Sequence, residues 1–263
     1  MTGDGVNDIL ALKEADCAIS VASGSEAARN VSHIVLMDNN FNNMPKVVAE
    51  GRRVINNIKN SSSLYLMKTL FTAILAIIFC AIGEAYMFMP KNVLLLEITV
   101  IAIPSFFLSL QPNKERVQGK FITHVMSGAV AGALTMLICV MSMYITNVAD
   151  PDEFGTHYKA MCMMALTFSG LVMVFRTCKP LNVYRAVLCL SVLTVTIICF
   201  AIPQLGNMFY DDWANLEWDY AKILILVVVL EAAFPISGWI IELMHLIFPS
   251  STGKHKRKEE NAK

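Results

Sequence analysis

The chain has 263 residues, of which 56% are hydrophobic and 16% are charged, and its formal net charge at pH 7 is zero. This composition is too apolar for an ordinary soluble domain and predicts a membrane protein. A net charge of zero gives no support for a nucleic-acid partner, so none is expected.

Residues 2–8 are the most specific segment of the chain. The segment contains two carboxylates, one side-chain amide and two glycines, which are Asp4, Asp8, Asn7, Gly3 and Gly5. Oxygen ligands suit Mg²⁺, and exposed backbone N–H groups at the start of a helix suit a phosphate. Glycine allows the backbone to approach a ligand closely, so the segment predicts a Mg²⁺-phosphate site.

The rest of the first 59 residues is predicted to be soluble, with alternating short helices and strands. A helix with Asp8 as its N-cap is expected to run to Ala15. Strands are expected at Cys17–Val21 and Ile34–Met37, with a helix at Glu26–Val31 between them. This order is typical of a parallel α/β domain, but two strands cannot close a core by themselves.

From Met44 a helical pattern without Gly or Pro after Gly51 runs into an apolar stretch, so one long stalk helix is expected to enter the bilayer. Six apolar segments have about the length that crosses roughly 30 Å of hydrocarbon. They are Leu64–Ile82, Val93–Leu110, Phe121–Ile145, Ala160–Phe175, Ala186–Ile202 and Ala221–Ile247. The predicted organisation is a soluble part with the stalk at 1–59, a six-span membrane domain at 60–250 and a basic tail at 251–263.

Charged residues alternate between the two ends of the predicted spans. Basic residues precede the first span, occupy the second and fourth loops and follow the last span: Arg52, Arg53, Lys59, Lys114, Arg116, Lys120, Arg176, Lys179, Arg185, Lys254, Lys256, Arg257 and Lys258. Acidic residues occupy the third and fifth loops: Asp150, Asp152, Glu153, Asp211, Asp212, Glu217 and Asp219. This alternation predicts an integral membrane protein with both termini in the cytoplasm. The basic tail is expected to touch the anionic lipid of the bilayer.

Residues 2–13, Thr-Gly-Asp-Gly-Val-Asn-Asp-Ile-Leu-Ala-Leu-Lys, resemble position by position the hinge motif of P-type ATPases. Similar runs follow at 23–28, 35–41 and 50–53, and the general pattern is most similar to bacterial cation-transporting members, which implies a bacterial plasma membrane. The resemblance implies a mainly α-helical membrane protein with six transmembrane helices. The C-terminal piece of an α/β HAD-like phosphorylation domain would precede these helices.

The resemblance also implies roles for the hinge-motif residues. Asp4 corresponds to a carboxylate that helps hold Mg²⁺ beside the phosphorylated aspartate, Asn7 to an amide near the phosphoryl group, and Asp8 to a carboxylate that organises the site. Three further residues are expected to contribute to cofactor binding: Thr2, Gly3 and Gly5. The metal would neutralise charge that develops in phosphoryl transfer, and the amide would donate to a phosphoryl oxygen. The alternative is a turn without catalytic meaning, and the length of the matching run argues against it.

The family's phosphorylated aspartate lies in an Asp-Lys-Thr-Gly-Thr run, which does not occur in this sequence. The resemblance therefore implies the C-terminal part of a pump that couples ATP hydrolysis to cation transport. A missing N-terminal part would bind ATP, and the chain alone is expected to be inactive. The alternative is a stand-alone six-span membrane protein, acting as a partner of an intact pump, or a non-functional gene fragment.

Three ionisable residues within the predicted spans are candidates for the ion path: Lys68, Glu97 and Glu231. Charge is costly in hydrocarbon and marks function there. Pro104 cannot donate a backbone hydrogen bond to Val100, so it is expected to kink its helix and free a carbonyl near Glu97. One hypothesis is that Glu97 and the backbone at Pro104 bind the transported cation, while Lys68 supplies a fixed charge or pairs with Glu97.

Alternatives stay open at each of these positions. Lys68 could extend to the membrane interface, and Glu97 could have no ligand role. For Glu231, a hydrogen bond to a neighbouring helix is favoured. Val100 and Ile101 occupy positions where calcium pumps carry a Thr-Asp pair. This difference argues against a two-calcium site of that kind. Calcium is the first guess for the cation from the general resemblance alone, and magnesium, manganese, a monovalent ion or a lipid-like substrate stay open.

Overall fold

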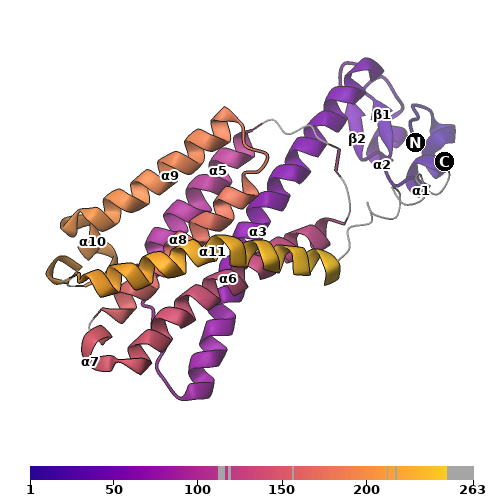
Figure 1. The fold of residues 1–263 in the computed structure, drawn as a ribbon. Helices are drawn as coiled ribbons and strands as arrows, with labels where there is room; N and C mark the ends of the chain where they lie inside the picture. Colours follow the sequence, from indigo (N-terminus) through magenta and orange to yellow (C-terminus); the bar gives the residue numbers. More distant parts are fainter. Residues whose placement is uncertain (112–115, 118–119, 156, 212, 217, 248–263) are drawn as a thin grey trace, which may run out of the picture. The chain divides into compact units, whose positions relative to one another are not determined.

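The computed structural model describes residues 1–247 except 112–115, 118–119, 156, 212 and 217. It divides into two compact units, and the boundary between them in the sequence follows Arg52, within the helix α3 (Met44–Ile82) (Figure 1). The predicted division at residue 59 lies on the same helix. The predicted basic tail and three of the charged loop residues, Lys114, Asp212 and Glu217, lie outside the described residues.

The first unit contains a strand–helix–strand arrangement. Strands β1 (Ile19–Val21) and β2 (Ile34–Leu36) pair in parallel, and α2 (Glu26–Val31) connects them. The hydroxyl of Ser25 caps α2 by accepting a hydrogen bond from the backbone N–H of Ala28 at 3.2 Å. The predicted order of elements is confirmed, and each strand is shorter than expected.

The remaining elements of this unit are short: η1 (Val6–Asp8), α1 (Ile9–Glu14) and η2 (Phe41–Asn43). Two small apolar clusters form its interior, and their buried members are Leu12, Ala18, Ala28, Ile19, Val21 and Leu36. A two-stranded sheet buries little apolar surface, so local hydrogen bonds carry much of the order in this unit.

Six helical runs among the described residues are long and apolar enough to cross a membrane, and each overlaps one predicted span. They are α3, Pro90–Leu110, α6 (Phe121–Ala149), α8 (Tyr158–Thr177), α9 (Val183–Ala201) and α11 (Tyr220–Ile247). The second run combines α4 (Pro90–Leu96), the π-helical turn η3 (Glu97–Ala102) and α5 (Ile103–Leu110). Short elements between the spans are α7 (Pro151–Phe154), α10 (Pro203–Phe209) and η4 (Trp213–Asn215). The prediction of six spans is confirmed.

Helices α6, α8 and α11 pack against one another, and α9 packs against α5 (Figure 1). Helix α3 presents one apolar stripe, whose buried members are Leu64, Met67, Phe71, Leu75 and Phe79. Side chains of α3 contact glycines of α6 where the two helices cross, since a Cβ on Gly128 would lie 2.5 Å from Ser63 Oγ. A Cβ on Gly132 would lie 2.2 Å from Met67 Sδ. Two small residues four apart are a common means of close packing between membrane helices.

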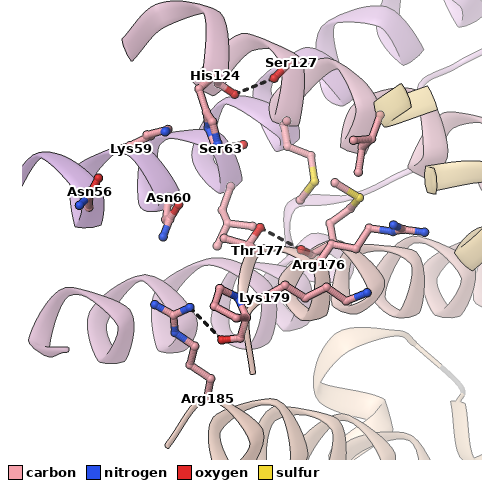
Figure 2. Close-up of a pocket in the computed structure, with 16 residues that line it drawn as sticks. Asn56, Lys59, Asn60, Ser63, His124, Ser127, Arg176, Thr177, Lys179 and Arg185 are labelled. Atoms are coloured by element: carbon pink, nitrogen blue, oxygen red, sulfur yellow. Dashed lines mark hydrogen bonds between the residues drawn. The ribbon is translucent and has the colours of Figure 1, made fainter. Parts of the chain in front are cut away.

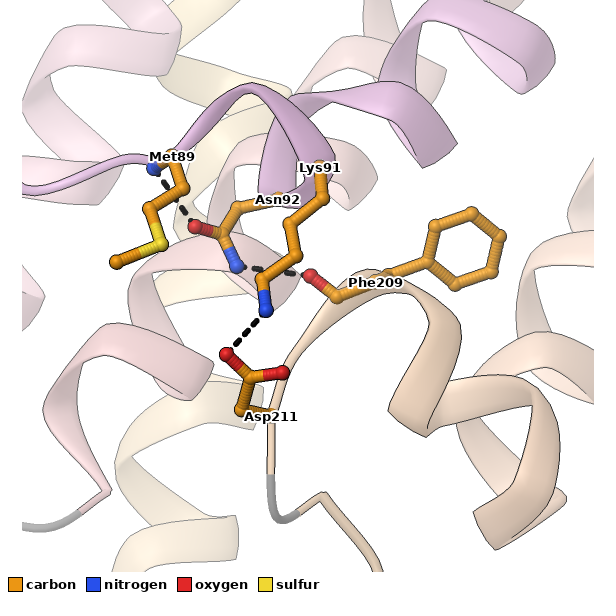
Figure 3. Close-up of polar contacts among 5 residues, drawn as sticks. All are labelled: Met89, Lys91, Asn92, Phe209 and Asp211. Atoms are coloured by element: carbon orange, nitrogen blue, oxygen red, sulfur yellow. Dashed lines mark hydrogen bonds and ion pairs between the residues drawn. The ribbon is translucent and has the colours of Figure 1, made fainter.

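The start of α4 is held by Asn92, which is 7% exposed (Figure 3). Its Oδ1 accepts a hydrogen bond from the backbone N–H of Met89 at 2.7 Å. Its Nδ2 donates to the carbonyl oxygen of Phe209 at 2.8 Å. Beside it, Lys91 and Asp211 form an ion pair. These contacts join the second membrane run to the end of α10.

We expect Asn92→Ala to lower the free energy of unfolding by about 1–3 kcal/mol, because a part-buried N–H of Met89 and a buried carbonyl of Phe209 lose their partners. Thermal unfolding of the purified chain in detergent, followed by circular dichroism, measures this change. The matched control is Asn207→Ala, which removes a 3.0 Å hydrogen bond from the exposed backbone N–H of Ala214. The control is expected to change stability by less than about 0.5 kcal/mol. An equal loss in both variants would contradict the role given to Asn92.

Candidate functional site

The segment at residues 2–8 begins beside β1 and leaves the sheet at its carboxyl edge. Thr2 forms a parallel bridge with Ile19, and the backbone N–H of Gly3 donates to the carbonyl of Ile19 at 3.0 Å. The backbone N–H of Ser25 donates to the carbonyl of Asp4 at 2.8 Å, which ties the Asp4 turn to the start of α2. Asp4 therefore lies where parallel strands end, the edge at which α/β domains bind ligands.

The side chain of Asp8 folds back over this loop. Its Oδ2 accepts a hydrogen bond from the backbone N–H of Gly5 at 3.2 Å. Asp8 is the N-cap residue of α1, as expected, but its side chain makes no capping hydrogen bond to that helix, because its carboxylate is turned toward Gly5. A Cβ on Gly3 would lie 2.6 Å from Asp8 Cβ, so the loop requires glycine at that position.

Two carboxylates and one amide are thus gathered in one short loop. Asp4 and Asn7 are exposed, and Asp8 is half-buried. Among the described residues, no group of three or more His, Cys, Asp or Glu side chains could hold a metal ion. Mg²⁺ commonly binds one or two protein carboxylates and completes its shell with phosphate and water oxygens. The loop fits such a partial set of ligands.

A second polar site lies within the second unit. Lys68 on α3 and Glu97 at the start of η3 form an ion pair, and their side chains are 29% and 45% exposed. Both line a cleft of about 630 Å³. Thr72 and Tyr86 also line it, and neither is among the candidates predicted from the sequence. Thr72 lies one helical turn after Lys68 on α3. This four-residue spacing indicates in the sequence that the two side chains share one face of the helix.

The helix that carries Glu97 is interrupted before Pro104. The π-helical turn η3 starts at Glu97 and is followed directly by α5, in which Pro104 occupies the first turn. Proline lacks an N–H group and crowds the preceding turn, and a π-turn gives it room. A Cβ on Gly170 of α8 would lie 3.0 Å from Val100 Cγ2, so α8 packs closely against this turn. The expected kink takes the form of a π-turn.

Glu231 lies apart from the Lys68–Glu97 pair. It is exposed on α11 and lines an apolar groove bounded by α8, α9 and α11. It makes no hydrogen bond to another described residue, so the expected bond to a neighbouring helix is wrong in this structure. The reason is that the residues around it in the groove are apolar.

Comparison with known proteins places the chain among transport ATPases, although no protein-family model matches it. It is 37% identical over 232 residues to the calcium-transporting ATPase CtpE of Mycolicibacterium smegmatis, covering 82% of this chain and 29% of that protein. It is 34% identical over 255 residues to CtpE of Mycobacterium tuberculosis, covering 92% and 32%. It is 34% identical over 196 residues to the probable cation-transporting ATPase exp7 of Streptococcus pneumoniae, covering 72% and 25%. The chain therefore spans about a third or less of these relatives.

We expect Gly3→Ala to loosen the loop, because the added methyl group must displace Asp8 and break its bond to Gly5. Overpacking of this kind costs about 1–3 kcal/mol, so amide hydrogen exchange at residues 4–8 should accelerate about tenfold or more. Exchange measured by mass spectrometry on the full chain tests this.

Gly5→Ala is the matched control. A Cβ on Gly5 would lie 3.6 Å from Asp8 Oδ2, an ordinary contact, and Gly5 has a φ of −93° that alanine adopts. Exchange in this variant should match that of the parent chain. Equal acceleration by both substitutions would remove the steric argument for Gly3.

Proposed function

Because the chain belongs to the P-type cation-transporting ATPases, we propose that it supplies the hinge loop of a phosphorylation site and six membrane helices of an ATP-driven cation pump. One observation carries this proposal: the Asp4–Asp8 loop leaves the carboxyl edge of a parallel strand pair, and six apolar helices follow it. The parallel strand–helix–strand order supports a HAD-like α/β phosphorylation domain. The phosphorylated aspartate and the ATP-binding residues would come from a preceding part of the pump.

In this proposal each loop residue has a distinct task. Asp4 helps hold Mg²⁺ beside the phosphoryl group, and Asn7 donates a hydrogen bond to a phosphoryl oxygen. Asp8 shapes the loop, since its carboxylate holds the N–H of Gly5. When bound, Mg²⁺ supplies positive charge that stabilises the transferring group. Thr2 and Gly3 anchor the loop to β1 through Ile19.

For the ion path we propose the cleft that contains Lys68 and Glu97. A cation that binds Glu97 must replace the Lys68 ammonium as the partner of its carboxylate. Lys68 then acts as a fixed counter-charge that competes with the ion. The π-turn before Pro104 supports a ligand role for backbone groups beside Glu97, because irregular helix backbone in membranes commonly lines such sites. Two of the relatives are named as calcium-transporting, so calcium is the first candidate.

The protein is an integral membrane protein, and we propose a bacterial plasma membrane with both termini on the cytoplasmic side. Basic residues gather at one end of the membrane helices, including Lys59, Lys179 and Arg185. Acidic residues lie at the opposite end of the membrane helices. Asp150 directly follows α6, and Asp211 lies between α10 and α11. The positive-inside rule assigns the basic end to the cytoplasm.

The test is a fusion of this chain to the preceding segment of the Mycolicibacterium smegmatis relative. The fusion should form a Mg²⁺-dependent phosphoenzyme from radiolabelled ATP, whereas the purified chain alone should form none. Asp4→Asn should lower phosphoenzyme formation by about 10²–10³-fold, the usual effect of losing one preorganised electrostatic group. Glu14→Gln, an exposed carboxylate change on α1, is the control and should have no effect. A folded fusion without phosphoenzyme would favour a stand-alone partner protein.

In the same fusion, Glu97→Gln should raise the cation concentration for half-maximal ATPase activity about tenfold or more, because a charge-bearing ligand is lost. Glu231→Gln, the control outside the cleft, should leave the cation dependence unchanged. The double variant Lys68→Gln/Glu97→Gln separates two roles. If Glu97 matters only as the partner of Lys68, the double variant regains the parent's cation dependence, and a ligand role predicts that it does not.

A further inference from the structure

A pocket of about 280 Å³ lies at the end of the second unit where basic residues gather (Figure 2). Four cationic side chains contribute to its lining: Lys59, Arg176, Lys179 and Arg185. They come from α3, from the end of α8, from the connection that follows α8, and from the start of α9. No Asp or Glu occurs among the described residues that line it. The lining therefore carries a strong excess of positive charge.

The charge of the two arginines is not neutralised within the described part of the chain. Arg185 is 8% exposed, and its Nε donates to Gln111 Oε1 at 2.6 Å. Its Nη1 donates to the carbonyl of Pro180 at 3.1 Å. Arg176 Nε donates to Ser237 Oγ at 2.7 Å. These neutral acceptors satisfy hydrogen bonds but leave the charge, and low-dielectric walls concentrate its field in the pocket.

The pocket changes from polar to apolar along α3. Lys59 and Asn60 line it one turn before Ser63, and Leu64 and Met67 line it further along the helix. Leu64 begins the predicted apolar span of this helix. The pocket thus has a basic end at the membrane boundary and an apolar end within the span, the same division as between the headgroup and acyl chain of a phospholipid.

We propose that this pocket binds a phosphate group, and that the apolar end favours the phosphate of an anionic phospholipid over a soluble phosphate. Basic pockets between membrane helices on the cytoplasmic side commonly hold anionic headgroups. The ammonium groups of Lys59 and Lys179 make no hydrogen bond or ion pair to a described residue, so their charges are available to a phosphate. The Lys179 ammonium lies over the rings of Phe175 and Phe234, 5.6 and 5.7 Å from their centroids. The proposal does not depend on the pump function, but it rests on the cytoplasmic orientation proposed above for the basic end of the helices.

The test is native mass spectrometry of the full purified chain in detergent, titrated with phosphatidylglycerol and, separately, with phosphatidylcholine. Phosphatidylglycerol should bind about tenfold more tightly. Lys59→Gln and Lys179→Gln should each weaken its binding about fivefold, and the double variant about 30-fold, the effect expected for each lysine near a lipid surface. Lys159→Gln, an exposed lysine at the opposite end of α8, should change nothing.

Circular dichroism and thermal unfolding test whether each variant is folded. If the double variant does not fold, the lipid affinities of the two single variants decide whether the lysines bind the headgroup. Unchanged phosphatidylglycerol affinity in the folded lysine variants, or equal affinity for both lipids, would overturn the proposal. A competition experiment with inorganic phosphate distinguishes a phospholipid from a soluble phosphate as the ligand. Displacement of the lipid by millimolar phosphate would overturn the lipid source, and persistence of the lipid supports it.

Discussion

The contact of Ser63 and Met67 on α3 with Gly128 and Gly132 on α6 is the interaction on which both polar sites of the second unit depend. Gly128 and Gly132 leave no room for a Cβ beside Ser63 and Met67. Helices in a membrane gain little from the hydrophobic effect and associate through such close packing. With Met67 held against α6, helix geometry turns Lys68 by about 100° away from that contact. This rotation faces Lys68 toward Glu97 and forms the ion pair.

The same rotation of α3 determines the basic pocket. Asn60 and Ser63 lie within one turn of each other on the helix, so packing of Ser63 on Gly128 brings Asn60 and Lys59 beside α6 and the end of α8. Lys59 and Lys68 are separated by about 14 Å along one continuous helix. A phosphate held between Lys59 and Lys179 would therefore restrain α3 and, through it, the ammonium group that faces Glu97.

Sequence reasoning reached the elements whose signals are local. The six spans follow from length and apolarity, and the strand–helix–strand order follows from alternating patterns around Ser25. It also anticipated that Lys68 and Glu97 could pair, because charges in hydrocarbon need partners. It missed the basic pocket and the apolar surroundings of Glu231, since both depend on helix rotation and on residues distant in sequence, such as Lys59 and Arg185. The π-turn and the fold-back of Asp8 depend on packing and loop geometry that no pattern encodes.

The loop in the first unit obeys a different constraint. Its unit has only small apolar clusters, so the loop owes its shape to local contacts. Gly3 packs against Asp8, the Gly5 N–H donates to the Asp8 carboxylate, and the Ser25 N–H donates to the Asp4 carbonyl. The Asp8 carboxylate therefore accepts a backbone hydrogen bond, whereas Asp4 and Asn7 are exposed. Two exposed groups cannot complete the shell of Mg²⁺. In the proposed Mg²⁺ site the remaining oxygens would therefore come from phosphate, from water or from another segment.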